Sequence, residues 1–80
     1  MFLKRIGPDP HAHGAHSVGC DGCPDIWELA DGDIAVIGIN ITGAARAHLP
    51  PTAGCGPDEQ IVRLPRSVLL NARRDLSKLV

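Results

Sequence analysis

The sequence predicts a small α+β domain, with an antiparallel sheet of about three strands and one C-terminal helix. In residues 25–41, apolar alternation is interrupted by Asp31-Gly32, a dipeptide typical of tight hairpin turns. Residues 65–77 begin with proline and continue with apolar residues close to helical spacing. Between these segments, residues 59–64 have the composition of a third strand.

Residues 1–18 have no sustained apolar period, and their prolines and glycines interrupt regular structure. We therefore expect a flexible N-terminal arm over residues 1–18 and a single small domain over residues 19–80. A long loop rich in proline and glycine, residues 44–57, separates the predicted hairpin from the third strand.

Composition limits the classes of function. A chain of 80 residues forms one domain with a small core. The formal net charge of −1 provides no basic excess for phosphate contacts, which argues against direct nucleic-acid binding. No apolar run is long enough to span a membrane and no signal peptide is recognisable, so we expect a cytoplasmic protein that does not associate with membranes.

The predicted hairpin carries apolar side chains on both faces. A two-residue turn at 31–32, with both residues at positive φ, would place Trp27 opposite Val36 and on the same face. A chain this short cannot cover both faces of the sheet. We predict that a homodimer or a heterologous protein partner buries the second face. The predicted interface residues are Trp27, Val36, Ile37, Ile39 and Ile41.

Cysteine and histidine gather before the hairpin, in "HAHGAHSVGCDGC". Cys20 and Cys23 have the two-residue spacing with which two thiolates bind one tetrahedral zinc ion. Cys55 lies between two glycines and can supply a third thiolate. The candidate ligands of one structural zinc ion are Cys20, Cys23, Cys55 and His16, with His48, His13 or His11 as the alternative fourth ligand.

Two other interpretations explain the same residues. Cys23 can be a small buried apolar side chain, with the histidines on a solvated arm. Cys20 and Cys23 can also form a thiol redox pair, although no helix N-terminus that would lower a thiol pKa is predicted beside them. Because thiols stay reduced in the cytoplasm, a disulfide framework is not expected.

No catalytic motif is recognisable. The chain contains no nucleophile elbow, P-loop or dinucleotide-binding glycine pattern, and it is too short to enclose a large substrate pocket. We therefore expect a non-enzymatic protein. A solvated helix face explains the basic set Arg63, Arg66, Arg73, Arg74 and Lys78.

Four short motifs carry a family resemblance: Cys23-Pro24, Asp31-Gly32, Val36-Ile37-Gly38 and Val62-Arg63-Leu64-Pro65. With them, residues 20–72 resemble a group of small, uncharacterised actinobacterial proteins that share this outline. The order of hairpin and helix is also similar to that of small domains encoded beside helix-turn-helix regulators. The resemblance implies an accessory partner of a transcriptional regulator without catalytic residues.

Overall fold

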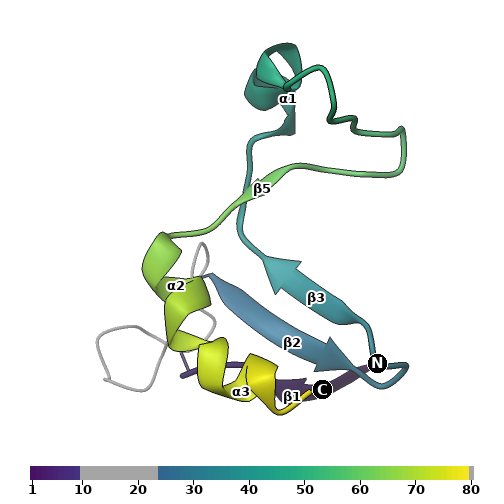
Figure 1. Ribbon diagram of the computed structural model, residues 1–80. Coiled ribbons are helices and arrows are strands. Elements are labelled where there is room, and N and C mark those ends of the chain that lie inside the picture. Colours follow the sequence, from purple (N-terminus) through teal and green to yellow (C-terminus); the bar gives the residue numbers. More distant parts are fainter. Residues whose placement is uncertain (10–23, 80) are drawn as a thin grey trace.

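The computed structural model describes residues 1–9 and 24–79, and it confirms the mixed α+β class (Figure 1). One sheet is antiparallel and has the order β1 (Phe2–Arg5), β2 (Asp25–Leu29) and β3 (Ile34–Ile37). A second antiparallel sheet pairs β4 (Ile39–Asn40) with β5 (Val62–Arg63). The helices are α1 (Thr42–Ala45), the 3-10 helix η1 (Arg46–His48), α2 (Arg66–Asn71) and α3 (Arg73–Ser77). None of the helices in this part of the chain is long and apolar enough to cross a membrane.

The N-terminal segment contributes a strand where the sequence predicts a flexible arm. Phe2–Arg5 pairs with β2, and the Ile6 N–H continues the pairing by donating to the Ile26 carbonyl at 2.8 Å. The Ile6 side chain is buried. Residues 1–9 therefore belong to the folded domain, because pairing with a distant strand orders a segment that shows no apolar period of its own. The remainder of the predicted arm, residues 10–18, lies outside the described residues.

The hairpin turn is one residue longer than predicted. The Leu29 N–H donates to the Asp33 carbonyl at 2.8 Å, and the Gly32 N–H donates to the Leu29 carbonyl at 3.0 Å. Gly32 alone in this turn has a positive φ, of 96°, so the two-residue turn is wrong. The Asp31 carboxylate accepts the Asp33 N–H at 2.9 Å, a bond that favours the longer loop.

The longer turn shifts the strand register by one residue. Ile26 lies opposite Val36, and Trp27 lies opposite Ala35. Side chains alternate between the faces, so this shift places Val36 on the opposite face from Trp27. The predicted pairing of Trp27 with Val36 is therefore wrong.

The core lies between one face of the three-stranded sheet and the two C-terminal helices. Its buried members are Ile6, Ile26 and Ala72, with Leu64, Val68 and Leu76 packed against them. The predicted single helix over residues 65–77 is divided at Ala72, where ψ is −8°. Gly7 approaches Ala72 closely here, since a Cβ on Gly7 would lie 3.2 Å from the Ala72 Cα.

The predicted third strand belongs to the second sheet. It is limited to Val62–Arg63, which pairs with β4, the last part of the predicted hairpin segment 25–41, and not with β2 or β3. Gly38 separates β3 from β4, and a Cβ at this position would lie 2.7 Å from the Arg63 carbonyl oxygen. The absence of a side chain at Gly38 therefore allows the two sheets to meet.

Replacement of Gly38 by alanine should destabilise the domain by about 1–3 kcal/mol, the usual cost of overpacking. The added Cβ would press on backbone at Arg63, which cannot move as a side chain can. Urea unfolding measures the change. Gly43→Ala is the matched control, because a Cβ on Gly43 meets nothing within 4 Å. Equal stability of the two variants would contradict this account of Gly38.

Candidate functional site

The face of the three-stranded sheet opposite the helices carries an aromatic pair. The ring centroids of Phe2 and Trp27 are 5.8 Å apart, and their planes meet at 70° in an edge-to-face contact. The guanidinium carbon of Arg5 lies 4.5 Å from the centroid of the Trp27 ring. Both contacts are favourable geometries for aromatic rings. They hold the three side chains in one arrangement.

The register of the strands extends this surface towards β3. Ala35 lies opposite Trp27, and Ile37 lies opposite Asp25. Phe2 and Ile37 are 58% and 49% exposed, whereas Trp27 and Ala35 are half-buried. We call Phe2, Arg5, Trp27, Ala35 and Ile37 the aromatic face. The surface is mainly apolar, with Trp27 between two exposed large side chains.

Arg5 is fixed by two carboxylates. Its Nε donates to one oxygen of Asp25 at 3.1 Å, and its Nη2 donates to the other at 3.1 Å. Its Nη1 lies 3.3 Å from an Asp9 carboxylate oxygen. The hydrogen bond to Asp25 raises the pKa of Arg5. Arg5 therefore contributes shape and a cation–π contact to the aromatic face, while its charge is balanced by its neighbours.

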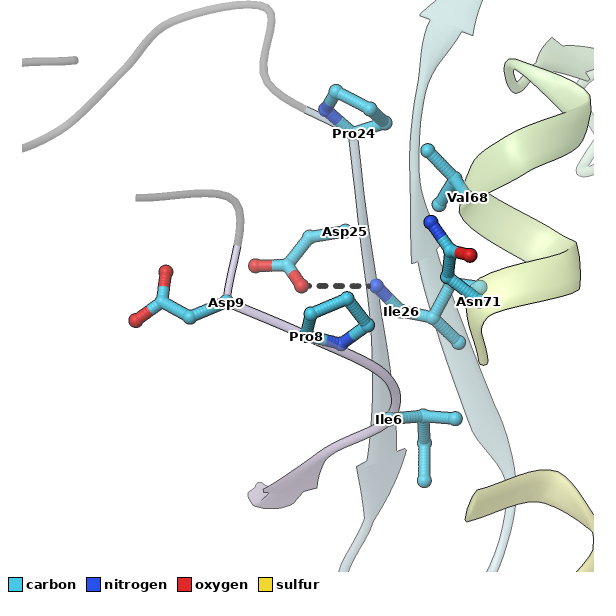
Figure 2. A pocket seen from close by; sticks show the side chains of 8 residues that line it. All are labelled: Ile6, Pro8, Asp9, Pro24, Asp25, Ile26, Val68 and Asn71. Atoms are coloured by element: carbon cyan, nitrogen blue, oxygen red, sulfur yellow. Dashed lines mark hydrogen bonds between the residues drawn. The ribbon is translucent and has the colours of Figure 1, made fainter. Parts of the chain in front are cut away.

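Asp25 ionises more readily than an ordinary aspartate. Burial is the largest single influence and raises its pKa, but hydrogen bonds from Arg5 and Trp27 and the charge of Arg5 outweigh it. The Ile26 N–H also donates to an Asp25 carboxylate oxygen at 3.1 Å (Figure 2). The pKa of Asp25 is therefore lowered. Asp25 stays ionised and holds Arg5 in place.

A small pocket lies beside Asp25 (Figure 2). Its volume is about 210 Å³, and its lining residues are Ile6, Pro8, Asp9, Pro24, Asp25, Ile26, Val68 and Asn71. Ligand pockets usually measure about 300–1,000 Å³. Both carboxylates in the lining are paired with Arg5. Among the described residues that line the pocket, neither carboxylate is therefore unpaired.

Only part of the predicted zinc site lies in the described residues. Cys55 is half-buried in the loop between η1 and β5, where its Sγ donates to the Glu59 carbonyl at 3.3 Å. His48 is exposed at the end of η1. Cys20, Cys23 and His16, like His11 and His13, lie outside the described residues. Within residues 1–9 and 24–79, no three histidine, cysteine or acidic side chains form a group that could hold a metal. The zinc site stays a prediction.

The predicted interface residues are divided among three surfaces. Trp27 and Ile37 belong to the aromatic face. Val36 lies on the opposite face, and Ile39 and Ile41 lie on β4 and directly after it. The predicted interface did not include Phe2 and Arg5 of the aromatic face. The aromatic and basic composition of residues 2–5 was the only available signal, because this segment has no alternation.

Comparisons with protein-family models, with curated proteins and with solved structures give no match.

Acidification should test the role of Asp25. Because its pKa is lower in the folded chain, ionised Asp25 stabilises the fold above its unfolded pKa of about 3.9. This contribution is lost as the pH falls through the lower folded value. Asp25→Asn should cost about 2 kcal/mol at neutral pH, the scale of hydrogen bonds to charged groups. The variant should also lose less stability on acidification than the wild type.

Urea unfolding across the acidic range measures both effects. Asp58→Asn is the control. It removes the same formal charge, but Asp58 is exposed in the loop before β5. If Asp25→Asn and the wild type lost stability in parallel on acidification, the stabilising role of ionised Asp25 would be refuted.

Proposed function

We propose that this chain is a non-enzymatic protein-binding module, and that the aromatic face is its docking surface. The supporting observation is the cluster of Phe2, Arg5 and Trp27, which is ordered by its own contacts and is continuous with the exposed Ile37. Tryptophan and arginine are enriched among the residues that dominate protein–protein binding energy.

The order of this cluster favours binding. A side chain that is already fixed loses little conformational entropy when a partner covers it. Arg5 is held by Asp25 and by the Trp27 ring, and Trp27 is held between Arg5 and Phe2. The partner surface that fits best is apolar, because Asp25 neutralises the charge of Arg5.

The small core also supports an external partner. Among the described residues, the buried apolar side chains are Ile6, Ile26 and Ala72, all on the helix-covered side of the sheet. Exposed large apolar side chains that lie together usually mark an interaction site. A transcriptional regulator as the partner follows from the family resemblance alone and stays a prediction.

Site-specific photo-crosslinking tests the docking surface. Phe2 is replaced by p-benzoylphenylalanine, which preserves the aromatic ring, and the chain is expressed in its native cells. We expect one discrete crosslinked protein, identified by mass spectrometry. The same photoreactive group at Leu70, an equally apolar exposed position on α2, should not give this product.

The identified partner is then purified and its affinity is measured by calorimetry. Phe2→Lys should weaken binding by about tenfold or more, which corresponds to about 1.4 kcal/mol. Leu70→Lys, with the same charge change, should bind as the wild type does. Equal affinities for the Phe2→Lys variant and the wild type would refute the aromatic face as the docking surface.

A further inference from the structure

One edge of the three-stranded sheet is free among the described residues. β3 pairs with β2 and has no described strand on its other side. The Leu29 N–H bonds to Asp33, which lies directly opposite, so hydrogen-bonded pairs on β3 alternate from Asp33 onwards. Ala35 and Ile37 therefore bond to β2. The backbone N–H and C=O groups of Ile34 and Val36 point to the free edge.

The same alternation continues past Gly38. The Ile41 N–H donates to the Ile61 carbonyl at 2.9 Å, and in this register Ile39 also bonds to β5. The backbone hydrogen bonds to β2 and to β5 thus both come from odd-numbered residues of the segment from Ile34 to Ile41. Along β3, the opposite edge of this segment has no partner strand among residues 1–9 and 24–79.

The free edge of β3 lacks the usual protection. Edge strands normally carry charged residues or proline, which prevent further pairing. β1, at the other edge of the sheet, carries Lys4 and Arg5. β3 reads Ile-Ala-Val-Ile, and its Ile34 and Val36 side chains are 41% and 40% exposed. Its uncharged residues and its unpaired backbone groups both favour the addition of a strand.

Going beyond the proposed function, we propose that β3 is a strand-pairing site for a second copy of this chain. The two β3 strands run antiparallel about a two-fold axis at Ala35. Ile34 of one copy then lies opposite Val36 of the other, and each pair can exchange both backbone hydrogen bonds. The result is one continuous sheet of six strands, twice the three of each chain.

A second copy fits this edge because the edge is complementary to itself. About this axis, the outward N–H and C=O groups of Ile34 meet those of Val36, and both side chains are apolar. The acidic Asp33 lies opposite Ile37, so the two Asp33 carboxylates do not face each other. A two-fold contact uses the same edge on both copies, and the pairing closes without further growth.

Sedimentation equilibrium over a wide range of concentration tests the dimer. The wild type should form a concentration-dependent dimer. Val36→Pro removes an outward N–H while leaving the bonds to β2 intact, and edge strands tolerate proline at such positions. Ile34→Lys places a charge on the edge. Each variant should raise the dimer Kd by about tenfold or more, equivalent to about 1.4 kcal/mol.

Leu70→Lys is the matched control, because Leu70 is similarly exposed, at 50%, but lies on α2. It should dimerise as the wild type does. Phe2→Lys should also leave the dimer intact, so loss of partner binding and loss of the dimer are distinguishable. A wild type that stays monomeric at every concentration, or a dimer unaffected by both edge variants, would overturn the proposal.

A disulfide test defines the register of the proposed β3–β3 pairing. This test can be carried out even if the Val36→Pro variant does not fold. The two copies of residue 35 would form a non-hydrogen-bonded pair with Cα atoms about 4.5 Å apart. This spacing suits a disulfide, so oxidised Ala35→Cys should give a peptide that links the two copies through residue 35. Ile37→Cys should give no equivalent peptide. If Ala35→Cys failed to crosslink in a dimer, pairing about Ala35 would be excluded.

Discussion

The core depends on the packing of the residues that follow β1 against the C-terminal helices. Its buried members are Ile6, directly after β1, Ile26 on β2, and Ala72 at the junction of α2 with α3. The Gly7 N–H donates to an Asp75 carboxylate oxygen at 2.7 Å, across almost the full length of the chain. This contact depends on Gly7, because any side chain there would press on Ala72. Together these contacts assign the helices to one face of the sheet.

The choice of face determines which surfaces remain for binding. The helices stabilise the side that carries Ile6 and Ile26, and the described helices leave the aromatic face uncovered (Figure 1). The proposed docking surface is thus a direct consequence of where the small core lies. The Arg5–Asp25 ion pair orders that surface without adding net charge to it.

One residue in the hairpin turn changes the composition of both faces. With the three-residue loop that ends at Gly32, Ala35 lies opposite Trp27, and Val36 moves to the face that carries Ile26. The shorter turn would have joined Trp27 and Val36 into one apolar surface. A register shift of one residue moves every side chain of a strand to the other face. The same register directs the backbone groups of Ile34 and Val36 to the free edge.

By itself, the sequence determined the α+β class, the hairpin around Asp31-Gly32, a helical segment after Pro65 and an excess of apolar strand residues, including Trp27 and Ile37. These features depend on local preferences, which neighbouring residues express directly. Only the tertiary structure decided that Phe2–Arg5 is a strand, that β5 pairs in a separate sheet and that Phe2 and Arg5 meet Trp27. Those outcomes depend on contacts between distant segments, and no periodicity within either segment specifies its partner.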